Sequence, residues 1–255
     1  MERYFGYDVG AMLLNEHEKN GVKIYAGKDV SKISYKAGKN GEVSAVVLEN
    51  GHELKADLVV IGAGIELNTQ IAIDAGLSMD KNGGISTNPF LQSSDPNIFA
   101  AGDIASFPSW HTGSNIRVEH WINAQDQGTY AAFNMLGKMT PYGNVPFFWT
   151  NHYGKGMSYV GNATTWDEIH IDGVPRANKF IAYFIKDNKV LAACHQGRGG
   201  DLLTVFEAMG QNVMPSADKI KSGEETPESM RKKLKLNKGG ACKRENCCQK
   251  KSIVQ

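Results

Sequence analysis

The segment that most constrains this chain is residues 97–103, with the sequence Asn-Ile-Phe-Ala-Ala-Gly-Asp. It predicts a short apolar strand that ends in two small residues, a glycine and a carboxylate. Small side chains let the backbone pass close to a ligand, Gly102 permits a tight turn, and Asp103 can accept hydrogen bonds from ligand hydroxyl groups. The same residues are also typical of an ordinary strand followed by a turn and a solvated aspartate, so the neighbouring segments must decide between the two interpretations.

The first sixty residues predict one helix, a small sheet and a buried strand. Residues 8–20 carry apolar side chains at helical spacing, which predicts a helix. Short β-rich stretches then predict an antiparallel meander, with a turn at Asn50 and Gly51. Residues 57–61, Asp-Leu-Val-Val-Ile, form an apolar run typical of a strand that is buried on both faces of a parallel sheet. The stretches assigned to the meander are residues 22–25, 30–35, 43–48 and 52–54.

The next segment, residues 62–67, has the sequence Gly-Ala-Gly-Ile-Glu-Leu and imitates the start of a dinucleotide-binding fingerprint. That fingerprint needs a third glycine for close packing of a helix on a strand, and Leu67 stands in its place. No further strand–helix–strand unit with an acidic ribose ligand follows. These departures argue against a phosphate-binding loop at this position.

The middle of the chain predicts two helices on either side of residues 97–103. Residues 68–75 are expected to form a short helix, residues 85–87 a strand, and residues 121–136 a longer helix. The longer helix would begin directly after Glu119 and His120. Unpaired amide groups at a helix N-terminus favour an electron-rich group, so this position suits the edge of a ligand ring.

From residue 147 the pattern changes to short β-prone runs followed by a helix, which predicts a separate α+β domain. Residues after about 215 are polar, Lys-rich and poor in aromatic side chains, so we expect them to be disordered. This tail is basic: residues 231–255 contain nine Lys or Arg and one Glu, whereas the whole chain has a net charge of +1. We interpret it as a solvated tail and expect no nucleic-acid partner. The β-prone runs are residues 157–160, 168–171, 180–185 and 190–194, and the helix is residues 202–209.

The number and spacing of the cysteines limit the cellular compartment and the redox chemistry that the sequence predicts. They are too few and too unevenly spaced for the disulfide scaffold of a secreted protein, which predicts an intracellular location, either cytoplasm or mitochondrion. No C-x-x-C pair is present to run a dithiol relay, and the missing paired spacing predicts no metal site. No apolar run approaches the roughly 20 residues of a transmembrane helix, so none is expected. The four cysteines are Cys194, Cys242, Cys247 and Cys248.

Three stretches in combination resemble a known family. Residues 93–103 resemble the second flavin motif of the flavin-dependent pyridine-nucleotide reductases. Residues 117–125 (Arg-Val-Glu-His-Trp-Ile-Asn-Ala-Gln) and 146–149 (Pro-Phe-Phe-Trp) narrow the resemblance to the apoptosis-inducing factors and ferredoxin reductases, and to the apoptosis-inducing factor 3 type in particular. This resemblance implies FAD and NAD(P)H as cofactors, with hydride transfer from the nicotinamide to FAD and then electron transfer to an unknown acceptor.

The resemblance also implies which residues contact the cofactors. Since the reacting atoms of hydride transfer belong to the cofactors, the protein mainly has to stack and orient them. Trp149, as a stacking wall, and Glu119, as an acceptor for the nicotinamide carboxamide, are the predicted catalytic residues. The alternative interpretations are that Trp149 is an ordinary core or interface tryptophan and that Glu119 is a carboxylate that interacts with the helix dipole at the start of a helix. The implied flavin contacts are Asp103, His120 and Trp121, with Gly102 in the turn, and the implied nicotinamide contacts are Gly64, Glu119, His120 and Trp149.

The predicted fold class is α/β, with incomplete FAD/NAD(P)-binding Rossmann-type domains followed by a smaller α+β C-terminal domain. Neither G-x-G-x-x-G loop of the family is present, which leaves two hypotheses. The first is an FAD-dependent NAD(P)H oxidoreductase seen as a fragment without both phosphate-binding loops, and the second is a truncated, non-catalytic homologue that acts as a binding or dimerisation module. The predicted domains are residues 1–60 (remnant of the NAD(P)-binding domain), 61–140 (C-terminal part of the FAD-binding domain), 146–212 (α+β domain, with a homodimer interface) and 213–255 (disordered basic tail).

Overall fold

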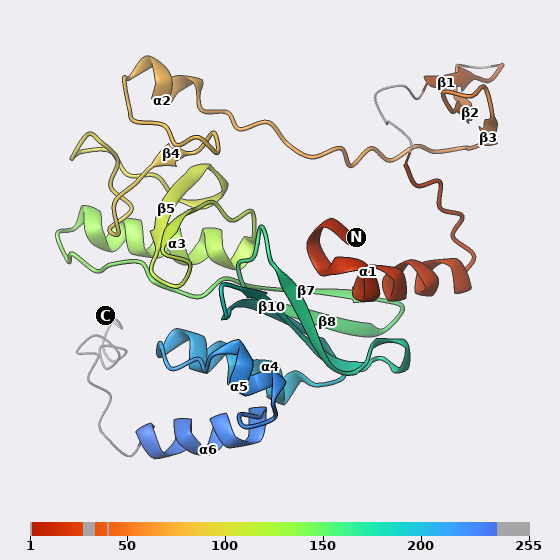
Figure 1. Ribbon diagram of the computed structural model, residues 1–255. Coiled ribbons are helices and arrows are strands. Elements are labelled where there is room, and N and C mark those ends of the chain that lie inside the picture. Colours follow the sequence, from red (N-terminus) through yellow and green to blue (C-terminus); the bar gives the residue numbers. More distant parts are fainter. Residues whose placement is uncertain (1, 28–33, 40, 239–255) are drawn as a thin grey trace, which may run out of the picture. The chain divides into compact units, whose positions relative to one another are not determined.

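The computed structural model describes residues 2–27, 34–39 and 41–238 (Figure 1). Cys242, Cys247, Cys248 and most of the strand predicted at residues 30–35 lie outside these ranges. The chain divides into two units, one made of residues 11–66 and the other of residues 1–10 and 67–255.

The first unit contains the second half of a helix and a small antiparallel sheet. Helix α1 (Glu2–Lys19) agrees with the helix predicted at residues 8–20 and has a kink at Gly6, where φ is 72°. The sheet has the order β1-β2-β3, with β1 (Ser34–Ala37), β2 (Val43–Val47) and β3 (Glu53–Lys55). The predicted turn is present, because Gly51 has a φ of 80° and its amide donates to the Leu48 carbonyl at 2.8 Å. Residues 22–25 form no strand, so that part of the prediction is wrong.

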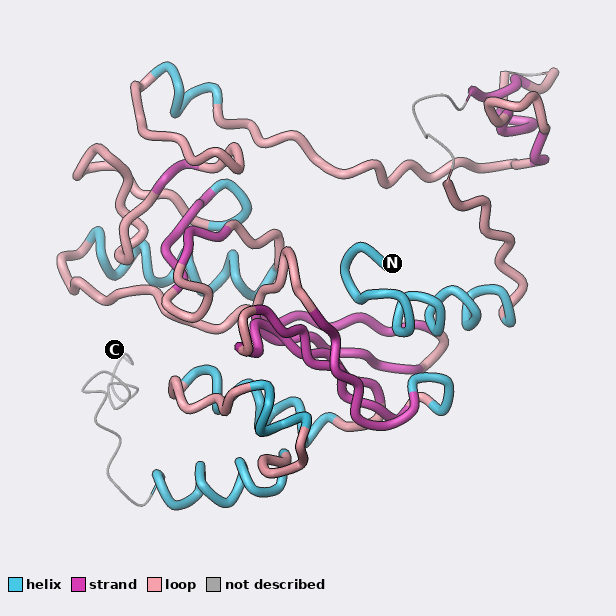
Figure 2. Tube along the Cα trace, in the orientation of Figure 1, coloured by secondary structure: helices cyan, strands magenta, loops and turns pink. Residues whose placement is uncertain are grey.

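Residues 57–61 do not form the predicted buried strand. They have no regular secondary structure, and Leu58, Val60 and Ile61 are 78%, 86% and 81% exposed (Figure 2). A parallel strand needs hydrogen-bonded neighbours and a cover on each face. None of the described strands pairs with this run, so its apolar pattern is not sufficient to make it a strand.

The second unit begins with a small mixed sheet and two helices. The sheet order is β4-β5-β6, in which β4 (Ile85–Ser86) is parallel and β6 (Ser114–Ile116) antiparallel to β5 (Ala105–Ser109). Helices α2 (Gln70–Asp74) and α3 (Trp121–Met135) agree with the two helices predicted here. The apolar core under α3 contains Leu91, Phe107, Ile116, Val118, Ala131 and Tyr142.

The C-terminal part of this unit is an antiparallel sheet covered by helices, as the α+β pattern predicted. The strand order is β7-β8-β11-β10-β9, and helix α4 (Gly199–Gly210) packs on one face of the sheet (Figures 1 and 2). A short 3₁₀ turn, η3 (Pro175–Ala177), joins β9 to β10. The strands are β7 (Phe147–His152), β8 (Lys155–Gly161), β9 (Glu168–Val174), β10 (Lys179–Lys186) and β11 (Lys189–Gln196).

The predicted disorder from residue 213 is wrong for the part of the tail that the structure describes. Two helices, α5 (Ala217–Lys221) and α6 (Pro227–Lys238), follow α4. Their apolar side chains join the core beneath the sheet together with Leu202, Val205 and Met209 of α4. The prediction used average composition, which hides a few apolar residues at helical spacing on one face. The buried side chains of the two helices are Ala217, Ile220, Met230 and Leu234.

Candidate flavin and nicotinamide site

The turn at Gly102 and Asp103 packs closely on helix α3. The 3₁₀ turn η2 (Gly102–Ile104) begins with Gly102 at a φ of 81°, a conformation that favours glycine. The Gly102 amide donates to Oε1 of the fully buried Gln127 at 2.7 Å, and a Cβ on Gly102 would lie 3.5 Å from the Cβ of Ala124. Residues before the turn form only a bridge between Phe99 and Gln92, so the predicted strand is shorter than expected.

Asp103 is half-buried and its carboxylate is available to a ligand. Among the described residues, none donates a hydrogen bond to this carboxylate, whereas the Asp103 carbonyl accepts one from Arg117 Nη1 at 3.1 Å. The same Arg117 nitrogen forms an ion pair with Glu119 Oε1 at 2.5 Å. Arg117 therefore joins the Asp103 turn to the residue that the resemblance assigns to the nicotinamide.

Sequence reasoning missed both Arg117 and Gln127. The pattern Arg-Val-Glu, with Val118 buried between two polar side chains, is a signal for Arg117 and Glu119 on a common face. Gln127 gave no such signal, because only the fold brings it against Gly102, which is 25 residues earlier.

His120 lies at the N-terminal end of α3 and is held by an aromatic contact. Its ring stacks on Phe148 of β7 with the centroids 4.4 Å apart and an interplanar angle of 27°. Burial lowers the pKa of His120 below its ordinary value, and the nearby carboxylates of Asp103 and Glu119 oppose this shift. The predicted Asp103, Glu119 and His120 therefore lie together, and the imidazole is mainly neutral at pH 7.

The two predicted tryptophans are both largely exposed. Trp121 begins α3 and is 77% exposed, and Trp149 lies on β7 and is 60% exposed. Side chains alternate along a strand, so Trp149 shares a face of β7 with Phe147, 6.1 Å away between ring centroids, and not with Phe148. No described ring contact joins Trp149 to His120, and its role at the nicotinamide stays a prediction.

Gly64 lies in the other unit, so the structure does not position it against the residues above. It has a φ of 92°, and a Cβ added there would meet no atom within 4 Å. No backbone crowding accounts for this glycine. Its predicted nicotinamide contact is neither supported nor contradicted.

The residues around Asp103 fit the chemistry of a flavin. Buried donors without a partner are present at Gln127 Nε2 and Arg117 Nε, and the Asp103 carboxylate offers acceptors. A flavin carries hydroxyl donors on its ribityl chain and acceptors on its ring, so these groups are complementary to it. No group of three His, Cys, Asp or Glu side chains in the described ranges is arranged to hold a metal ion.

The chain belongs to the pyridine nucleotide-disulphide oxidoreductase family, whose model matches residues 1–128. A second model, described as the reductase C-terminal domain, matches residues 147–226. These matches confirm the resemblance and the predicted fold class. The second match also extends beyond residue 213, in agreement with the folded helix α5.

Within this family the chain is similar to apoptosis-inducing factors and ferredoxin reductases. It is 34% identical to apoptosis-inducing factor 3 of Homo sapiens over 191 residues, which are 74% of this chain and 31% of that protein. It is 38% identical over 189 residues to the ferredoxin–NAD(+) reductase component of the 3-phenylpropionate/cinnamic acid dioxygenase of Photorhabdus laumondii, covering 73% and 46% of the two chains. The chain thus spans about a third to a half of the length of these curated relatives.

The chain is also similar to solved structures of ferredoxin-type reductases. The putidaredoxin reductase of a covalent complex with putidaredoxin matches with a TM-score of 0.82 and 28% identity, over 92% of this chain and 56% of that one. A ferredoxin reductase from Rhodopseudomonas palustris matches with a TM-score of 0.74 and 29% identity, over 94% and 56%. No helix in the described part of this chain is both long and apolar enough to cross a membrane.

Proposed function

We propose that this chain forms the C-terminal part of an FAD-dependent NAD(P)H oxidoreductase of the apoptosis-inducing factor type. The observation that carries the proposal is the grouping of Asp103, Arg117, Glu119 and His120 around the turn at the start of α3. When bound, FAD would accept a hydride from NAD(P)H and release electrons one at a time to an acceptor of the ferredoxin class. The relatives named as ferredoxin reductases support this choice of acceptor.

In this proposal each residue binds or orients a cofactor. Asp103 accepts hydrogen bonds from the ribityl hydroxyl groups, and the neutral His120 contacts the ring without placing a positive charge beside it. Glu119 accepts from the nicotinamide carboxamide, while its ion pair with Arg117 holds the carboxylate in place. Trp149 and Trp121 offer exposed indole faces on which a planar ring can stack.

The two pyrophosphates of the cofactors would need loops that the described residues do not contain. Residues 62–67 have no regular structure, and the next helix, α2, begins only at Gln70. Glycine-rich loops at helix N-termini contribute much of the affinity for dinucleotides. We therefore expect this chain alone to bind FAD more weakly than a protein with both loops.

The test is a titration of the purified chain with FAD, followed by flavin absorption and fluorescence. Asp103→Ala should weaken binding about 10- to 100-fold, because it removes a charged acceptor of hydroxyl groups. Asp74→Ala, which changes an exposed carboxylate on α2, is the matched control and should leave the affinity unchanged. If the wild-type chain binds no FAD, or if the two variants lose affinity equally, the proposal is wrong.

A second measurement separates the nicotinamide from the flavin. Rapid mixing of the FAD-loaded chain with NADH should show slower flavin reduction for Trp149→Ala at unchanged flavin content. Loss of flavin without a change in the reduction rate would show that Trp149 belongs to the framework and not to the nicotinamide site.

A further inference from the structure

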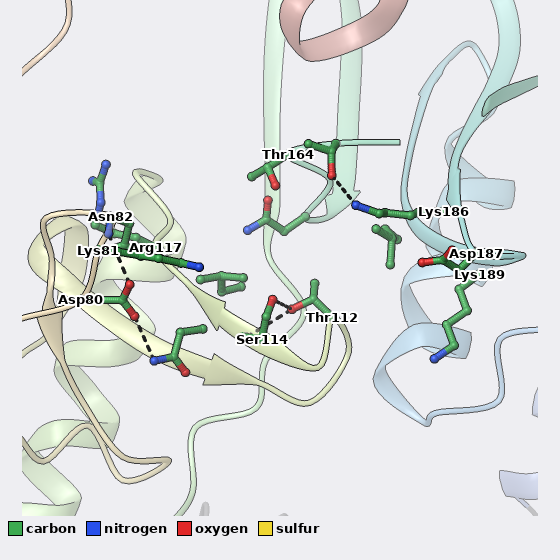
Figure 3. A pocket seen from close by; sticks show the side chains of 15 residues that line it. Asp80, Lys81, Asn82, Thr112, Ser114, Arg117, Thr164, Lys186, Asp187 and Lys189 are labelled. Atoms are coloured by element: carbon green, nitrogen blue, oxygen red, sulfur yellow. Dashed lines mark hydrogen bonds between the residues drawn. The ribbon is translucent and has the colours of Figure 1, made fainter. Parts of the chain in front are cut away.

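A polar cavity of about 530 Å³ lies on the surface of the second unit, apart from the proposed stacking residues (Figure 3). One side is formed by residues 80–82 and the β5–β6 hairpin. The other side is formed by residues 162–165 and the β10–β11 hairpin. Its volume is in the range typical of small-molecule sites, and most of its lining residues carry a charged, amide or hydroxyl group.

Basic side chains outnumber acidic ones in this cavity. It is lined by Lys81, Arg117, Lys186 and Lys189 but by only two carboxylates, Asp80 and Asp187. Asp80 is already occupied, because its Oδ2 accepts hydrogen bonds from Ser106 and Asn115 at 3.0 Å each. These bonds, led by the one from Asn115, lower the pKa of Asp80, so it stays ionised and bound to the wall.

The β10–β11 hairpin places two lysines directly opposite each other. Lys186 and Lys189 are cross-strand partners, joined by a tight turn in which Asp187 and Asn188 have φ values of 50° and 60°. Like charges at opposed positions of an antiparallel pair destabilise it. No carboxylate of the described residues forms an ion pair with either lysine or with Lys81, whereas Lys221, on helix α5, pairs with Glu168. A bound anion would supply the missing counter-charge.

Hydroxyl groups line the cavity, and a hydrogen bond between the two hairpins connects its walls. Thr112 and Ser114 of the β5–β6 hairpin are hydrogen-bonded to each other at 3.2 Å, and Thr165 accepts from Lys186 Nζ at 2.9 Å. His111 Nε2 lies 3.0 Å from the Leu191 carbonyl, and burial lowers the His111 pKa, so the neutral ring donates this bond. This contact links the two hairpins and holds the two walls of the cavity together.

We propose that this cavity binds a small phosphorylated anion, with Lys186, Lys189 and Lys81 as the charged contacts and threonine hydroxyls as further donors. Lysine ammonium groups recognise phosphoryl oxygens as compact charges, and hydroxyl groups add short hydrogen bonds to them. A hollow of this size suits a metabolite-sized ligand better than a protein surface. The charged contacts of this inference, Lys81, Lys186 and Lys189, are not residues of the proposed redox site, and Arg117 is the residue that both sites share.

The test uses inorganic pyrophosphate as the probe, titrated into the purified full chain by calorimetry at constant ionic strength. We expect saturable binding at one site per chain. The double variant Lys186→Gln/Lys189→Gln should weaken it about tenfold or more, since each lysine contributes a charge-assisted contact. The control Lys36→Gln/Lys55→Gln removes the same charge from exposed lysines of the β1–β3 sheet and should leave the affinity unchanged.

Further variants and ligands test which property of the cavity recognises the anion. Lys186→Arg/Lys189→Arg should retain most of the affinity, and orthophosphate should bind more weakly than pyrophosphate because it offers fewer oxygens and less charge. Absence of saturable pyrophosphate binding would overturn the proposal. So would equal weakening in the control, or binding of an oligonucleotide or acidic peptide without binding of pyrophosphate.

Discussion

Met230 provides the sharpest test of the folded C-terminal helices. Its side chain lies on α6, is only 3% exposed and belongs to the main apolar core. If helix α6 is part of the domain, truncating this side chain will leave a cavity in this core, on the side where α6 packs on α4. The described members of that core from α4 and the neighbouring helices are Leu202, Val205, Ala208, Met209, Ala217, Ile220 and Leu234.

The magnitude follows from the buried position. Replacing a fully buried methionine with alanine destabilises a protein by about 2–5 kcal/mol, from lost transfer free energy and the cavity left behind. For Met230→Ala we expect a loss of about 3 kcal/mol in the free energy of unfolding. The control on the same helix is Lys232→Ala, whose side chain is 73% exposed and pairs with Glu228, and it should change stability by less than about 0.5 kcal/mol.

The assay must report on one unit, because a chain with two units can unfold in more than one step. Urea unfolding followed by circular dichroism gives the overall loss, and hydrogen exchange of the β10 and β11 amides reports on the sheet that α4 and α6 stabilise. Faster exchange of these amides in Met230→Ala but not in Lys232→Ala is the expected result. Equal stability and equal exchange in wild type and Met230→Ala would refute the packing of α6 on this core.

Two further predictions concern pH and the glycine turn. Burial lowers the pKa of His111, His120 and His195, so below pH 6.5 the unfolded chain binds more protons than the folded chain. The free energy of unfolding should therefore fall on acidification from pH 7.5 to 5.5. A free energy of unfolding that does not change with pH over this range would contradict the prediction. Gln127→Leu leaves the Gly102 amide without its acceptor and should destabilise the chain by about 1–3 kcal/mol in urea unfolding, whereas Gln125→Leu, at an exposed position of α3, should have little effect.

The sequence predicted the elements whose signals are local. Helix α3, four of the five strands of the C-terminal sheet and the turn at Gly51 all carry their periodicity or turn residues within a few positions. Strand β7 was not among the predicted strands. Residues 57–61 show the limit of this approach, since a parallel strand depends on partners that the run itself does not specify. The tail shows the opposite error, because its average polarity concealed Met230 and Leu234 on one helix face.

The residues of the candidate site also divide into those that local motifs predict and those that only the fold brings together. Asp103, Glu119 and His120 were predicted from motifs, and the structure brings them together through Arg117 and through the charges that act on His120. Gln127 could not be found from the sequence, because its role depends on the approach of two segments in space. The tertiary structure is also needed to decide which face of a strand points toward a site.

Arg117 decides how the two proposals can be tested separately. Its side chain lines the cavity, while its guanidinium contacts the Asp103 carbonyl and the Glu119 carboxylate. Its Nε is buried without a partner, so replacing this residue would change a buried polar network as well as a charge. Loss of flavin or anion binding in an Arg117 variant would therefore not identify which site had failed. Asp103 and the Lys186–Lys189 pair each belong to only one of the two sites, and variants at these positions separate them.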